Sequence, residues 1–175
     1  MLLFSGEMIM PKAFKVTAAV LVIVILGVAT YSYFAFADER RVQKSLRELE
    51  RKISEPIGNG LDIAMAGVTI KPLFMPEVSI AILRNGHEWR RDFGRDELLH
   101  GILAIKQRNP EIVLNLEFSR RDVRITGERI AEVNIMVKVE NFSELVEPQR
   151  LTFTLEKDTE DNWKLAAVNS GIPAL

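Results

Sequence analysis

The sequence contains no cysteine, which excludes disulfides, thiolate nucleophiles and every metal site built on cysteine. Histidine is also scarce, with 2 residues, and no H-E-x-x-H pair, G-x-S-x-G turn, phosphate-binding loop or dinucleotide fingerprint occurs. Neither sign of charge dominates, because 23 Lys and Arg stand against 24 Asp and Glu for a net charge of −1. With no field to attract nucleic acid, the sequence predicts no nucleic-acid partner. Because the motifs above are missing, it also predicts no metal and no cofactor.

One long run without charge, VTAAVLVIVILGVATYSYFAFA, extends from Val16 to Ala37. A helix of this length measures roughly 33 Å, enough to cross a hydrocarbon core of about 30 Å. Tyrosine and phenylalanine gather near the end of the run, as they do at a membrane interface. The sequence therefore predicts a short N-terminal tail (residues 1–15), a transmembrane anchor (residues 16–37) and a separate domain (residues 38–175).

The flanks of this run leave its orientation and its processing open. Six basic residues follow the run against two before it, which favours a cytoplasmic domain, but the positive-inside count is reliable only for short loops. The basic head and a small-x-small pattern ending at Ala37 resemble a signal peptide and favour export. We expect a single-pass inner (cell) membrane protein with an extracytoplasmic C-terminal domain, or a secreted or periplasmic domain after cleavage following Ala37.

Three helices are predicted in the domain. Residues 38–54 place apolar side chains at helical spacing among charges, which indicates an amphipathic helix that packs on its own domain; a short coiled coil is the alternative, although it would need more heptads. Residues 61–74 begin as an apolar helix that Pro72 closes, and a third helix follows Gly94 and stops at Asn109-Pro110. The expected buried faces are Val42, Leu46, Leu49 and Ile53 in the first helix, and Leu98, Leu99, Ile102, Leu103 and Ile105 in the third.

The rest of the domain alternates as strands do. Residues 77–93 predict a hairpin around Asn85-Gly86, a dipeptide that accepts the positive φ angles of a tight turn. Residues 112–125 alternate with a phase shift near Arg120-Arg121 that indicates a β-bulge. Residues 131–140 predict a strand with one buried and one wet face. Leu151 to Leu155 repeats that alternation, and a polar turn at residues 158–162 leads into a last strand at residues 163–168.

This order of elements resembles the nuclear-transport-factor-2-like superfamily, which includes ketosteroid isomerases and SnoaL-type cyclases. The resemblance covers residues 38–170 and rests on three stretches: LFMPEVSI at 73–80, GRDEL at 94–98, and the closing hairpin from Leu155 to Val168. It implies an α+β fold in which an N-terminal transmembrane helix precedes a cone-shaped domain, with a curved, mostly antiparallel sheet packed on three helices around a conical cavity.

The resemblance does not extend to catalytic groups. Ketosteroid isomerases carry a carboxylate base a few residues into the first strand, where this sequence has Ala81-Ile82-Leu83. They carry an acid before the penultimate strand, where this sequence has Pro148-Gln149-Arg150. Proton abstraction needs a base and an oxyanion donor. No catalytic residue is therefore predicted.

The weak candidates for ligand binding are His100 on the third helix and a basic cluster, Arg90, Arg91 and Arg95. The cluster suits anionic headgroups or an acidic partner, or else it is a plain solvated surface. Asp96 lies at i, i+4 from His100, although such pairs are usually surface electrostatics. His87, next to the hairpin turn, is expected to be solvent-exposed.

Several functions remain open at this point. The leading hypothesis is a membrane-tethered, non-enzymatic module that binds a protein partner or a small apolar ligand; its layout resembles the inner-membrane scaffold subunits of type IV secretion machines. An enzyme of cyclase, dehydratase or isomerase type with unfamiliar catalytic positions is the first alternative. The second is a homodimer through the wet face of the strand at 131–140, which carries Glu132, Asn134, Met136 and Lys138.

Overall fold

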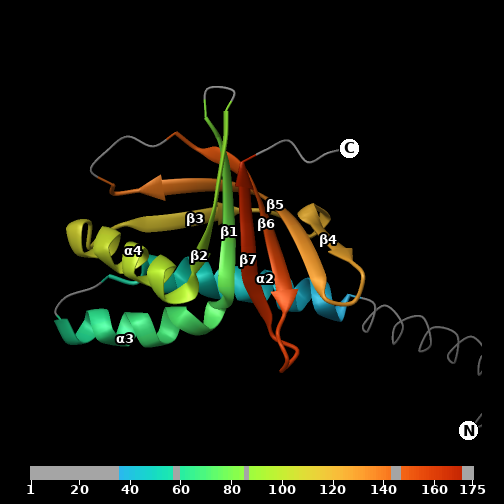
Figure 1. Cartoon of the computed structure of the whole chain (residues 1–175), viewed down its shortest axis with the longest axis horizontal. Helices are drawn as coiled ribbons and strands as arrows, with labels where there is room; N and C mark the ends of the chain where they lie inside the picture. Colours follow the sequence, from blue (N-terminus) through green and yellow to red (C-terminus); the bar gives the residue numbers. More distant parts are fainter. Residues whose placement is uncertain (1–35, 57–59, 85–86, 143–146, 171–175) are drawn as a thin grey trace, which may run out of the picture. The chain divides into compact units, whose positions relative to one another are not determined.

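The computed structural model describes residues 36–56, 60–84, 87–142 and 147–170 (Figure 1). The chain divides into two compact units, Met1–Asp38 and Glu39–Leu175, and the second holds nearly all of the described residues. The predicted tail, residues 16–35 of the predicted anchor, and the turn residues Asn85-Gly86 lie outside the described residues. Among the helices in the described part, none has both the length and the apolar character needed to cross a bilayer.

The first two helices follow the sequence prediction closely. Helix α2, Ala37–Ser54, buries Val42, Leu46 and Leu49 of the predicted stripe, and Ile53, its fourth member, is partly buried against the core. Helix α3 spans Gly60–Ile70, and the chain then tightens into the 3-10 helix η1, Lys71–Leu73, with the predicted Pro72 in its first turn. Proline has no backbone N–H to donate and a fixed φ, so it suits the start of a helical turn and cannot continue the preceding helix.

Helix α4, Arg95–Arg108, corrects one part of the prediction. Leu99 is buried as expected, but Ile105 is 46% exposed, and Lys106 is buried with 1% exposure. The helical period explains the difference. A residue seven positions after Leu99 returns to the same face of the helix after two turns, whereas a residue six positions later is rotated well away from it. Lys106, not Ile105, therefore continues the stripe.

Seven strands form one curved sheet with the order β2-β1-β7-β6-β5-β3, and β4 also pairs with β5 (Figure 1). The pairing of β1 with β7 is parallel and all the others are antiparallel. The predicted α+β class, with a mostly antiparallel sheet and three helices, is thus confirmed for this domain. The strands are β1 Phe74–Arg84, β2 His87–Gly94, β3 Val113–Glu117, β4 Val123–Thr126, β5 Ile130–Glu140, β6 Gln149–Lys157 and β7 Trp163–Ser170.

The predicted bulge near Arg120-Arg121 is a full turn in the structure. The 3-10 helix η2, Arg120–Asp122, separates β3 from β4, and both strands pair with β5. Its capping box is complete: the Asp122 carboxylate accepts a hydrogen bond from the backbone N–H of Ser119 at 2.7 Å, and the Ser119 side chain accepts one from the backbone N–H of Asp122. A stable local turn of this kind takes up more chain than a one-residue bulge.

The hydrophobic core lies between the inner face of the sheet and the helices. Strand β5 shows why: Ala131, Val133 and Ile135 are fully buried, while Glu132 and Asn134 between them are exposed. The alternation of a strand sends these two sets to opposite faces. The same core cluster contains side chains from α2, α4, β6 and β7, so helices and sheet share a single core.

Candidate functional site

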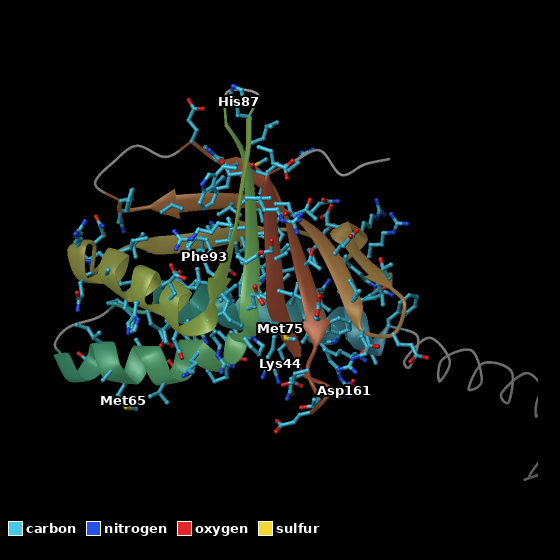
Figure 2. All side chains as sticks on the ribbon, viewed as in Figure 1. Lys44, Met65, Met75, His87, Phe93 and Asp161 are labelled. Atoms are coloured by element: carbon cyan, nitrogen blue, oxygen red, sulfur yellow. The ribbon has the colours of Figure 1, made fainter. Side chains whose placement is uncertain are left out.

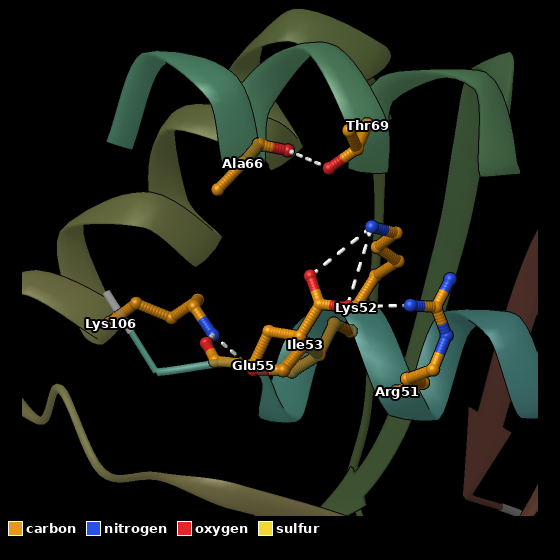
Figure 3. Close-up of polar contacts among 7 residues, drawn as sticks. All are labelled: Arg51, Lys52, Ile53, Glu55, Ala66, Thr69 and Lys106. Atoms are coloured by element: carbon orange, nitrogen blue, oxygen red, sulfur yellow. Dashed lines mark hydrogen bonds and ion pairs between the residues drawn. The ribbon is translucent and has the colours of Figure 1, made fainter. Parts of the chain in front are cut away.

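The interior of the domain holds one buried charge among the described residues, the ammonium group of Lys106. Its Nζ donates hydrogen bonds to the carbonyl oxygens of Ile53 and Glu55, the latter at 2.7 Å (Figure 3). Burial lowers the pKa of Lys106, and the nearby charge of Glu55 partly opposes this shift. The amine therefore satisfies carbonyl groups at the C-terminal end of α2 and just beyond it. Its hydrogen bonds are structural.

The other buried side chains of the described interior are apolar. At the position where the resemblance places a catalytic base, Ile82 is 40% exposed and Leu83 is 57% exposed. Within the described residues, no buried carboxylate or histidine stands beside a second polar group. General acid–base chemistry needs such a group within hydrogen-bond reach of the substrate, so the described interior offers no proton-transfer pair.

His100 and Asp96 are both exposed on α4, and the main partner of Asp96 is a residue other than His100. The Asp96 carboxylate pairs with the ammonium of Lys71 at 2.7 Å. The hydrogen bond and the charge of Lys71 are the main reasons why the pKa of Asp96 is lowered, and His100 contributes least. The predicted i, i+4 relation is therefore weak. A ligand-binding role for His100 stays a prediction.

The three predicted arginines do not form one patch. Arg90 and Arg91 are consecutive in β2 and thus point to opposite faces of the hairpin. The Arg91 guanidinium pairs with Glu97 at 2.6 Å and lies 4.7 Å from the centre of the Phe93 ring. Arg95 opens α4, and its buried Nε has no hydrogen-bond partner within the described structure. A shared role for these arginines in binding stays a prediction.

The β1–β2 hairpin exposes apolar side chains near its turn. Ile82, Leu83 and Trp89 are 40%, 57% and 45% exposed. His87 is the first residue of β2, next to the turn, and is exposed as predicted. Phe93 lies further along the strand (Figure 2). Phe93 stands 6.2 Å from Trp89 between ring centres, in a tilted arrangement. Exposed apolar side chains of this size, gathered in one place, are typical of interaction surfaces.

A second surface, which we call the α2 basic groove, was not identified from the sequence. It is a hollow of about 480 Å³ between α2 and the segment that links β3 to η2. One of the residues that line this hollow is Lys44, which is exposed and labelled in Figure 2. Four of the seven lining residues are cationic and none carries a carboxylate. The lining residues are Arg40, Gln43, Lys44, Arg47, Phe118, Ser119 and Arg120.

One side of this groove could be recognised from the sequence. Arg40, Lys44 and Arg47 stand at helical spacing in α2 and therefore share one face. Arg120 lies far away in the chain, and no local pattern connects it to α2. The structure brings it there and holds it by an ion pair with Glu39, at 2.7 Å between Nε and the carboxylate.

The curved sheet, its strand order and the three helices together define a domain with the nuclear-transport-factor-2-like fold, also described as cystatin-like. The chain is similar to an NTF-2 like protein of unknown function from Pseudomonas aeruginosa, with 10% identity and a TM-score of 0.53, covering 74% of this chain and 95% of that one. It is also similar to a domain of unknown function with a cystatin-like fold from Nostoc punctiforme, with 14% identity and a TM-score of 0.52, covering 78% of each chain.

A second protein of unknown function with a cystatin-like fold from Nostoc punctiforme gives 13% identity and a TM-score of 0.51, covering 79% of this chain and 94% of that one. No protein-family model and no curated protein matches the sequence. At these identities the likeness shows the fold alone. It supports the resemblance at the level of the superfamily fold and leaves the function to be argued from the surface and the interior of this chain.

Proposed function

We propose that this chain is a membrane-anchored, non-catalytic module, whose domain at residues 38–175 binds a protein partner or a small apolar ligand on the extracytoplasmic side. The run from Val16 to Ala37 supports the anchor by its length and lack of charge. The apolar interior and the engaged amine of Lys106 support a role without acid–base catalysis.

The observation that carries the interaction role is the exposed apolar surface of the β1–β2 hairpin. Ile82 pairs with Trp89 across the hairpin, so the two side chains share one face, where they are 40% and 45% exposed. Large aromatic and aliphatic side chains lose solvent contact when a partner covers them, and tryptophan is among the residues that most often dominate the binding energy of an interface. The hairpin therefore suits an apolar surface on a partner protein.

A single introduced thiol tests the anchor and its orientation, because the chain has no cysteine of its own. Glu132→Cys places the thiol on an exposed position of β5, and Lys12→Cys places it in the N-terminal tail. With a membrane-impermeant maleimide on intact cells, we expect position 132 to react and position 12 to stay unlabelled. The reverse pattern would place the domain in the cytoplasm. Release of the domain into the soluble fraction would indicate cleavage.

A photo-crosslinking amino acid tests the hairpin as the partner site. Trp89 and Ile105 are 45% and 46% exposed, so they form a matched pair on different elements, β2 and α4. We expect one defined crosslinked species in intact cells from position 89 and none from position 105. Equal crosslinking from both positions would mean that the hairpin is not the binding surface.

A further inference from the structure

The α2 basic groove is built from two parts of the chain that present cations toward the same hollow. Arg40, Lys44 and Arg47 come from one face of α2, and Arg120 comes from η2 on the other side. The aromatic ring of Phe118 lines the hollow between them. Glu50 and Glu39 pair with Arg47 and Arg120 from outside the lining. The lining itself holds four cations and no carboxylate, so it favours an anionic group with several oxygen acceptors.

The flanking contacts orient the arginines. The Arg47 guanidinium donates hydrogen bonds to the carbonyl of Leu116 and to Glu50, each at 2.7 Å, and lies 4.4 Å from the centre of the Phe118 ring. A guanidinium has five N–H donors, so these two bonds hold the group in place and leave donors for an incoming anion. The Lys44 side chain is exposed on the same face of α2 and adds a further positive charge to the lining.

The groove begins close to the apolar run. Helix α2 starts at Ala37, the last residue of that run, and Arg40 and Arg47 follow at about 5 Å and 15 Å along the helix axis by the helical rise. The Debye length is about 8 Å at physiological salt and about 30 Å at 0.01 M, so Arg40 interacts with a charged surface at the end of the run in either condition, and Arg47 does so at low salt. Basic residues beside a membrane-spanning segment are attracted to anionic lipid in this way.

We propose that the α2 basic groove binds the phosphate groups of anionic phospholipid headgroups at the surface of the membrane that holds the run at residues 16–37. The inference rests on the anchor of the proposed function and adds a second, lipid-specific contact to it. The groove then fixes the first turns of α2 against the headgroups, where an anchor alone would leave the domain free to turn.

Chemical labelling of lysines in the full chain tests this binding. The chain is placed in nanodiscs of phosphatidylcholine alone or mixed with phosphatidylglycerol, and the rate of acylation of each lysine is measured by mass spectrometry. We expect the labelling of Lys44 to slow by about fivefold or more in the anionic discs at low salt and to recover at high salt. Lys71 lies in η1, outside the residues that line the groove, and its side chain is 42% exposed, so it serves as the internal control with an unchanged rate.

Two variants with the same change of charge sharpen the test. Arg40→Glu reverses a charge in the groove, and Arg90→Glu reverses one on the exposed part of β2. The protection of Lys44 should fall by about fivefold or more in the first variant and stay unchanged in the second. If Arg40→Glu does not fold by circular dichroism, Arg120→Gln weakens the groove from its other side and replaces it.

The outcomes separate the two proposals. A chain that resists carbonate extraction, but whose Lys44 reacts equally in both kinds of disc, keeps its anchor and overturns the lipid-binding groove. Release of the chain by carbonate would overturn the proposed anchor. Lipid binding by the groove would then be tested by flotation of the chain with anionic vesicles at low salt. Flotation with those vesicles and not with neutral ones retains the groove, and absence of flotation overturns it.

Discussion

Lys106 shows how one buried charge is accommodated in this domain. Its side chain continues the apolar stripe of α4, and its amine reaches the end of α2 (Figure 3). The C-terminus of a helix carries partial negative charge on carbonyls that lack intrahelical partners. Lys106 donates hydrogen bonds to carbonyls there, and thereby connects α4 to residues that lie more than 50 positions earlier in the chain.

The variant Lys106→Met should therefore lower the free energy of unfolding by about 1–3 kcal/mol. Methionine keeps most of the apolar volume but leaves the carbonyls of Ile53 and Glu55 without their donor. Chemical denaturation measures the change, and the exposed neighbour Gln107→Ala should alter stability by less than about 0.5 kcal/mol. A more stable Met variant would mean that the cost of burying the amine exceeds the value of its two hydrogen bonds.

Asp158 makes the turn between β6 and β7 sensitive to acid. The hydrogen bond from Lys164, together with those from the backbone N–H groups of Asn162 and Glu160, lowers the pKa of Asp158 to about 2 from its usual 3.8. A carboxylate with a lowered pKa in the folded state stabilises the fold fully above pH 3.8, and this contribution is lost as the pH falls from 3.8 toward 2.

The variant Asp158→Asn should accordingly melt at a lower temperature than the wild type at neutral pH, with a gap that narrows as the pH falls through this window. Its amide oxygen still accepts the backbone N–H groups, so the turn persists while the ion pair with Lys164 is lost. Thermal melts at a series of pH values measure the gap. The exposed carboxylate Glu128, changed to Gln, is the control. A gap that stays constant with pH would contradict the assignment.

At the scale of elements, two glycines have opposite requirements. Gly101 lies inside α4 and is exposed, and a Cβ added there meets no atom within 4 Å. Gly127, in the turn between β4 and β5, has a φ of +71°, in the left-handed region that side chains with a Cβ avoid.

We expect Gly101→Ala to raise the free energy of unfolding by about 0.5–1 kcal/mol, because alanine loses less backbone entropy in a helix. Gly127→Ala should lower it by about 1–2 kcal/mol. Denaturant titrations of the two variants provide the comparison. A loss of stability in Gly101→Ala would indicate that α4 packs against something that the described residues do not include.

The elements themselves were largely predictable from the sequence, because their signals are local. The stripe of α2, the alternation of β5 and the effect of Pro72 each depend on neighbours within a few residues. The role of Lys106 was missed, since its partners Ile53 and Glu55 lie on another helix. The α2 side of the α2 basic groove could be predicted, because its basic residues stand at helical spacing. The position of the other side depends on the pairing of β3 and β4 with β5, which no local pattern specifies.

At the scale of the whole molecule, the outer face of β5 bears on the oligomeric state. The Thr152 hydroxyl donates a hydrogen bond to the Asn134 amide oxygen at 3.0 Å, and Lys138 pairs with Glu117. The polar groups on this face thus satisfy one another, and Met136 between them is half-buried. The cores of homodimer interfaces are mostly apolar, and Met136 is the one apolar side chain among the four positions predicted for this face.

We therefore expect Met136→Asp to leave the mass of the full chain in detergent unchanged, as measured by light scattering or sedimentation. The control Ile105→Asp introduces the same charge on α4, away from this face. A wild-type dimer that Met136→Asp alone dissociates would restore the homodimer hypothesis and contradict the monomeric binding module.

The parallel pairing of β1 with β7 sets the order in which this domain is completed. Strand β1, the first in the chain, pairs with β7, the last, on the side of the sheet centre. Phe74 thus pairs with Leu165, some ninety positions later in the chain. During synthesis the β1–β2 hairpin can form early, but the sheet is not continuous until β7 has emerged from the ribosome. Any shortened chain that ends before Trp163 leaves the hairpin without a strand to join, and its apolar face becomes a target for chaperones and proteases.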